Sequence, residues 1–70
     1  MKLSAIQKAV TDVTTLSEVD NESAHVMEDK LYLAVLRAIA NSDYKTKVEM
    51  VEAAAEVLKA ANLKYRRWYA

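Results

Sequence analysis

The sequence predicts an all-α fold of three helices followed by a C-terminal tail, and three observations support it. The 70 residues include no Gly and no Pro, so no strong helix breaker lies inside the chain. Ala, Leu, Glu and Lys, which all favour helices, are abundant. Apolar residues recur at three- and four-residue spacing in three stretches. Without Gly, standard hairpin turns and phosphate-binding loops are also excluded.

The first predicted helix covers residues 4–16 and has apolar residues at helical spacing along one side. Ser4 and Gln7 fit a capping box at its start, in which each side chain bonds a backbone N–H that has no partner inside the helix. The second half contains several β-branched residues, which lose side-chain freedom in a helix. We therefore expect fraying near Leu16.

The second predicted helix covers residues 22–40 and follows a polar break where Asp20 or Asn21 can cap it. Residues 41–43 end this helix and cap the third, predicted at 44–62. Charged residues follow one side of the third helix and apolar residues the other, so we expect the apolar side to be buried. That side comprises Tyr44, Val48, Val51, Ala54, Ala55 and Leu58.

The second helix is apolar around most of its circumference, with only Lys30 and Arg37 in a clearly polar sector. A helix of this kind needs burial on nearly all sides. Two short flanking helices cannot readily cover it, and a chain of this size has a marginal core on its own. We therefore expect a symmetric homo-oligomer with the second helix near its centre.

Three polar residues, His25, Glu28 and Asp29, interrupt the apolar sector, with His25 one turn from both acids and next to Tyr32 on the helical wheel. A buried carboxylate needs a cation, a donor or a ligand. One interpretation is a structural network that a tail Arg completes across a subunit interface. A second is a ligand pocket. A metal site is the third and the weakest, because its further ligands would have to come from another copy.

The tail, residues 63–70, contains three cations and no acid, so residues 1–62 carry a net charge of −3. Its guanidinium groups can bind phosphate or carboxylate through two bonds, and its aromatic rings can stack on a base. These residues are Arg66, Arg67, Tyr65, Trp68 and Tyr69. The alternative is that the rings dock on the helices while the Arg residues pair with the acidic excess. Three terminal cations are too few for general nucleic-acid binding.

A combination of short segments stands out: Ala24-His25-x-x-Glu28-Asp29, Leu31, Val35-Leu36-Arg37-Ala38-Ile39-Ala40 and the ending Arg67-Trp68-Tyr69-Ala70. Together they resemble a loose group of short, mostly uncharacterised helical proteins of bacteriophage and bacterial genomes. Many members carry a Gly after the Ala-Ile-Ala segment, where this chain has Asn41 and Ser42. The resemblance implies a phage or prophage origin and a role in the cytoplasm of a bacterial host. Small phage proteins of this type often bind a host protein or a nucleotide signal of host defence.

These observations lead us to expect a non-enzymatic oligomeric binding protein that holds a small anionic ligand, such as a nucleotide, at its subunit junctions. Arg66 and Arg67 would hold phosphate, tail rings would stack on a base, and His25 with an acid would bond the sugar or base. The alternative is an inhibitor that binds a host protein. An enzyme is the third class, because the motif only partly matches the Glu-x-x-Glu and Glu-x-x-Asp motifs of helical pyrophosphohydrolases. We expect no cofactor, no membrane span and no signal peptide.

Overall fold

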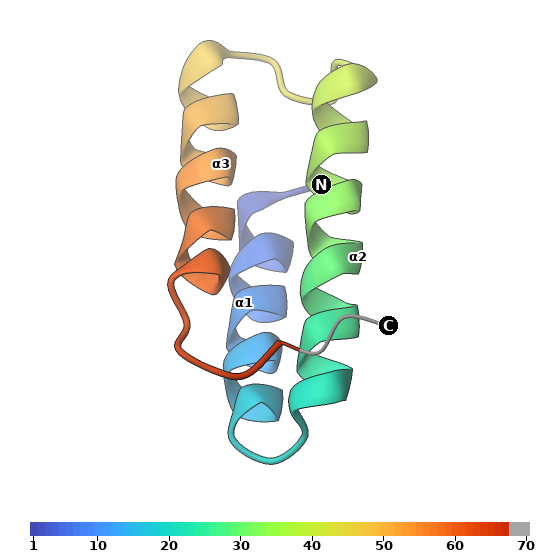
Figure 1. Cartoon of the computed structure of the whole chain (residues 1–70). Helices are drawn as coiled ribbons and strands as arrows, with labels where there is room; N and C mark the ends of the chain where they lie inside the picture. Colours follow the sequence, from blue (N-terminus) through green and yellow to red (C-terminus); the bar gives the residue numbers. More distant parts are fainter. Residues whose placement is uncertain (68–70) are drawn as a thin grey trace.

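A computed structural model describes residues 1–67, which form three helices and no strand (Figure 1). Helix α1 spans Leu3–Ser17, α2 spans Asn21–Ala40 and α3 spans Lys47–Ala61. The chain reverses direction at each connection, so α2 runs antiparallel to both other helices (Figure 1). Helix α1 packs against both neighbours, and α2 and α3 contact each other less. The predicted all-α class with three helices is therefore confirmed.

The core lies where the three helices meet along α1. Its members are Ile6 and Val10 of α1, Leu31 and Val35 of α2, and Ala53, Val57 and Ala60 of α3. Ile6 and Val13 are the largest fully buried side chains. Met1, Tyr32, Ile39 and Tyr44 cover the edges of this core. No helix within residues 1–67 combines the length and the apolar character needed to cross a bilayer.

Helix α1 differs from its predicted form at both ends. Lys2 is the N-cap, and no side chain caps the helix there, so the predicted capping box of Ser4 and Gln7 is wrong. Packing of Met1 against the core lets the helix begin before Ser4, which places Ser4 inside the first turn. The C-terminal end continues to Ser17, where hydroxyl groups of the last two turns donate to backbone carbonyls within the helix. The helix therefore ends one residue later than predicted, and the Ser17 hydroxyl bonds to a carbonyl of the last turn.

Helix α2 begins as predicted. The carboxylate of Asp20 accepts bonds from the backbone N–H and the hydroxyl of Ser23, at 3.1 and 2.7 Å. These bonds lower the pKa of Asp20, because they stabilise its charged form. Glu22 lies in the first turn, where a negative charge suits the helix dipole.

The C-terminal end of α2 closes with a left-handed residue. Ser42 has φ 58°, a conformation that favours Gly because a Cβ crowds the backbone there. Its N–H donates to the carbonyl of Ile39 at 3.1 Å, and the N–H of Asp43 donates to the carbonyl of Ala38 at 2.9 Å. This pair of bonds is a Schellman motif, which satisfies the final carbonyls of the helix.

Helix α3 begins three residues later than predicted and buries a different side. Thr46 caps it, with its hydroxyl oxygen accepting from the N–H of Glu49 at 3.1 Å. The buried residues are Ala53, Val57 and Ala60, so the predicted buried side is wrong. Val48, Val51 and Leu58 of that side are instead 64%, 58% and 58% exposed. Small Ala side chains let α3 approach α1 closely, which explains why this side packs inward.

Candidate functional site

The candidate site centres on the carboxylate of Glu28, which α2 holds in a buried position facing the end of α3. Arg67 reaches it from the tail, which crosses from α3 past α1 toward α2 (Figure 1). Its Nη2 lies 2.7 Å from Oε1 of Glu28, and its Nε lies 2.9 Å from Oε2. This is a bidentate contact, in which a planar guanidinium matches both oxygens of one carboxylate.

Arg67 also ties the tail to α3. Its Nη2 donates to the carbonyl of Ala60 at 3.1 Å, one of the last carbonyls of the helix. Its guanidinium carbon lies 4.2 Å from the centre of the Tyr65 ring, within the range of a cation–π contact. The bond to Glu28 is the main reason that the pKa of Arg67 is raised. One guanidinium thus joins α2, α3 and the tail.

Two phenols surround this ion pair. Burial, followed by the nearby charge of Glu28, raises the pKa of Tyr32 to about 12. Burial and the same carboxylate also raise the pKa of Tyr65. Both hydroxyl groups therefore keep their protons at neutral pH, and neither is suited to act as a phenolate base.

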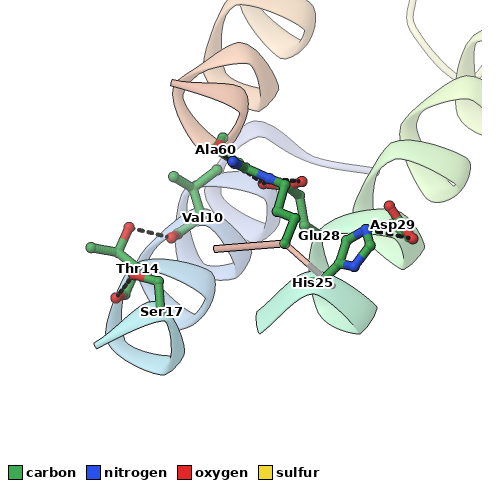
Figure 2. A network of polar contacts seen from close by, with 8 residues as sticks. Val10, Thr14, Ser17, His25, Glu28, Asp29 and Ala60 are labelled. Atoms are coloured by element: carbon green, nitrogen blue, oxygen red, sulfur yellow. Dashed lines mark hydrogen bonds and ion pairs between the residues drawn. The ribbon is translucent and has the colours of Figure 1, made fainter. Parts of the chain in front are cut away.

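A second polar pair lies beside the first on α2. The Nε2 atom of His25 is 3.4 Å from Oδ2 of Asp29, one helical turn further along. Figure 2 shows the His25 ring beside Asp29, while Glu28 points away toward Ala60 at the end of α3. The imidazole is largely buried and the Asp29 carboxylate is exposed. The predicted pairing of His25 with an acid is therefore present, and Asp29 is its partner.

The structure brings most of the predicted site residues together, in two adjacent groups. Glu28, Tyr32, Tyr65 and Arg67 form the first, which we call the Glu28 cluster, and His25 with Asp29 forms the second. Arg66 is exposed on the tail. Trp68 and Tyr69 lie outside the described residues.

Sequence analysis considered an ion pair of Glu28 with a tail Arg across a subunit interface. The ion pair instead forms within one chain, so the carboxylate needs no partner from a second subunit. Arg67 already binds that carboxylate, so a phosphate could use this guanidinium only by displacing Glu28. Among residues 1–67, no group of three or more His, Asp or Glu side chains is arranged to hold a metal ion.

Two surface hollows lie elsewhere and include none of the predicted site residues. The larger, of about 430 Å³, lies between the N-terminus and the α2–α3 connection, and the Tyr44 side chain lines it. The smaller, of about 310 Å³, lies between the end of α1 and the start of α2, beside Leu16 and Val26. The Glu28 carboxylate is buried and bonded to Arg67, so the Glu28 cluster is a contact between helices and tail.

Sequence analysis predicted more apolar surface on α2 than one chain can bury, but it did not predict exposed apolar side chains on α3. Val26, Leu33 and Leu36, which we call the α2 exposed face, are half-exposed or more. Val48, Val51 and Leu58 are exposed on α3 in the same way. Their three- and seven-residue spacing is visible in the sequence and is typical of contacts between helices of different chains.

Comparison of the chain with models of protein families, with curated proteins and with solved structures found no match.

Proposed function

We propose that this protein is a non-enzymatic binding protein that works as a homo-oligomer. The observation that carries the proposal is the α2 exposed face. Folding of one chain buries only one side of α2 and leaves Val26, Leu33 and Leu36 in contact with water. Exposed apolar side chains that recur along one side of a helix are typical of an interaction site. A second copy that covers it adds burial to the small core of a 70-residue chain.

The spacing of the α2 exposed face supports a contact between helices. Val26, Leu33, Leu36 and Ala40 follow one another at seven, three and four residues, as the a and d positions of a coiled-coil seam do. Asp29 occupies the one polar position of this seam. Its Oδ2 atom lies 3.4 Å from Nε2 of His25, so this carboxylate already has a polar neighbour within its own chain before association. A single polar residue in such a seam can select one register and one oligomeric state.

The Glu28 cluster supports a structural role rather than catalysis. A general acid or base needs a group that is free to exchange a proton with a substrate. Glu28 is nearly fully buried and both of its oxygens accept bonds from Arg67. The cluster instead holds the tail against α2 and thereby sets the shape of the surface around it.

Sedimentation velocity across a wide concentration range tests self-association. We expect the wild-type chain to sediment as an oligomer, and a variant with Leu33→Gln and Leu36→Gln to shift strongly toward the monomer. Val19→Gln is the matched control, because Val19 is exposed in the α1–α2 turn and lies off the seam. A wild-type chain that stays monomeric at every concentration contradicts the proposal and leaves the face to a different protein, such as one from a host cell.

A small anionic ligand is the second candidate, and the exposed cations of the tail favour it. Lys64 and Arg66 are exposed on either side of Tyr65. Titration calorimetry with cyclic and linear nucleotides tests this role directly. We expect micromolar binding that a Lys64→Glu and Arg66→Glu double variant weakens at least tenfold. Lys8→Glu combined with Lys45→Glu, at two exposed lysines outside the tail, serves as the charge-matched control. If the protein is folded and oligomeric but gives no binding heat, the titrated classes of nucleotide are excluded as its ligands.

A further inference from the structure

A second apolar stripe, on α3, carries a more specific inference than the α2 exposed face. We define the α3 seam as Val48, Val51, Ala55 and Leu58, which follow one another at three, four and three residues. These are the a and d positions of two heptads. All four are exposed, because they lie on the side of α3 opposite the buried Ala53, Val57 and Ala60. No residue in the described part of the chain covers them.

We propose that the α3 seam binds the α3 seam of a second copy of this chain, with the two helices parallel and in register. The inference rests on the proposed self-association and names one surface that makes it. Each a and d residue then packs against the same residue of the other copy. This contact buries the largest apolar side chains that α3 leaves exposed within a single chain.

The charges beside the seam select the parallel arrangement. Lys47 occupies a g position and Glu52 the following e position. In a parallel pair, g of one helix lies beside the next e of the other, so two contacts form between Lys47 of one copy and Glu52 of the other. Within its own chain, neither side chain forms an ion pair with any of residues 1–67.

An antiparallel arrangement lacks this complementarity. Matching Val48 with Leu58 and Val51 with Ala55 places Glu52 of one copy close to Glu52 of the other. Like charges at such positions destabilise the contact. The same apolar seam therefore pairs favourably in one direction and unfavourably in the other.

The length of the seam sets its strength. Residues 48–58 span only about 15 Å of helix, at about 1.5 Å per residue. Such a contact buries much less than the roughly 800 Å² per partner of a standard stable interface. We therefore expect the α3 contact to be weak in isolation and to act together with the α2 exposed face in the complete oligomer.

Disulfide cross-linking of the full chain tests the arrangement, because the protein has no Cys of its own. Val48→Cys and Leu58→Cys are made as separate variants and oxidised under mild conditions. In the parallel arrangement, each variant forms a covalent dimer with itself. In the antiparallel arrangement neither does so, because identical positions lie about 15 Å apart. A mixture of the two variants then cross-links instead, and that result overturns the proposal.

Three controls make the result interpretable. Gln7→Cys, exposed on α1, reports random collisions, and cross-linking equal to that of Val48→Cys would overturn the proposal. Lys47→Glu added to Val48→Cys should reduce the dimer yield several-fold, and Glu52→Lys added to both should restore it. Far-UV circular dichroism should stay unchanged, since these side chains lie outside the core. An oligomer whose α3 variants do not cross-link contradicts only this inference, whereas a monomeric wild type contradicts the proposed function itself.

Discussion

Arg67 and Glu28 lie 39 residues apart in the sequence and form a bidentate ion pair that joins the tail to the middle helix. The Glu28 side chain is only 4% exposed and that of Arg67 is 21% exposed. Removing a carboxylate from water to this extent is costly unless a cation and hydrogen bonds replace the lost hydration. The tail is therefore part of the folded unit, at least as far as Arg67.

The first prediction concerns this ion pair. Arg67→Met should lower the free energy of unfolding by about 3 kcal/mol, because it leaves a buried carboxylate without a partner. Glu28→Leu combined with Arg67→Met should recover most of that loss, since the uncompensated charge is then gone. Urea unfolding at a fixed protein concentration measures both effects.

Lys64→Met is the control for the ion-pair variants, because Lys64 is an exposed cation of the same tail. It should change the free energy of unfolding by less than about 0.5 kcal/mol. An effect of Arg67→Met as small as that of Lys64→Met would show that the tail does not stabilise the helices.

The second prediction compares two leucines on opposite sides of the packing. Leu31→Ala should cost about 2–5 kcal/mol of stability, because Leu31 is fully enclosed by the core. Leu58→Ala should cost less than about 0.5 kcal/mol in the dissociated subunit, because Leu58 faces water there. Chemical unfolding at low protein concentration separates the two. Equal losses would mean that α3 is rotated relative to its position here.

The third prediction concerns the left-handed residue that ends α2. Ser42→Gly should raise the free energy of unfolding by roughly 0.5–1 kcal/mol. Gly removes a backbone strain of about 1–2 kcal/mol from the folded chain. Part of this gain is lost because Gly also gives the unfolded chain more conformational freedom. Ser4→Gly, within α1, provides the control and should bring no gain. Thermal unfolding followed by circular dichroism measures both variants. A loss of stability in Ser42→Gly would contradict the Schellman geometry.

The fourth prediction concerns alkaline pH. The pKa of Tyr32 rises to about 12 in the folded chain, from an ordinary value near 10. The unfolded chain therefore loses this proton first, so the contribution of Tyr32 is complete below pH 10 and declines as the pH rises toward 12. The decline should not exceed about 1.4 kcal/mol per pH unit for this group. Urea unfolding between pH 9 and pH 12 measures it.

Tyr32→Phe provides the matched comparison for the alkaline decline. Its stability should fall less steeply above pH 10, and the remaining slope should come from Tyr44 and Tyr65, whose pKa values are also raised. Absorbance near 295 nm should show one phenol fewer titrating at the highest pH. Identical slopes in the two proteins would show that Tyr32 has an ordinary pKa in the folded chain.

The positions of the helices could be predicted from the spacing of apolar residues and from capping residues close by in the sequence. The same spacing predicted much of the packing of α1 and α2. Ile6, Val10 and Val13 form the buried apolar stripe of α1, and the partly buried Leu3, Ala9 and Leu16 lie beside it, so α1 has only one side to bury. Asp20 lies where a cap is needed, and its side chain performs that role. In these places local preference and long-range packing agree, which is why sequence reasoning succeeds.

The sequence predicted that the partner of Glu28 is a cation, but it did not identify the residue. Its position in an apolar sector of α2 required a cation, and the tail Arg residues were the guanidinium candidates beside Arg37. The selection of Arg67, and its approach within the same chain, depends on where α3 ends and how the tail crosses α1. Neither is encoded in the local pattern around Glu28.

Composition and spacing were enough to predict three helices and the capping of α2. They also showed that an acid in the apolar sector of α2 needs a cation as its partner. Each of these conclusions depends on residues within about one helical turn. The buried side of α3 depended on three-dimensional packing. Helix α3 has one apolar side with larger residues and another that consists of Ala53, Val57 and Ala60. A helical wheel predicts that the side with the larger residues is buried. Close approach to α1 favours the smaller side, so the bulkier residues of the α3 seam face outward, where a second copy can reach them.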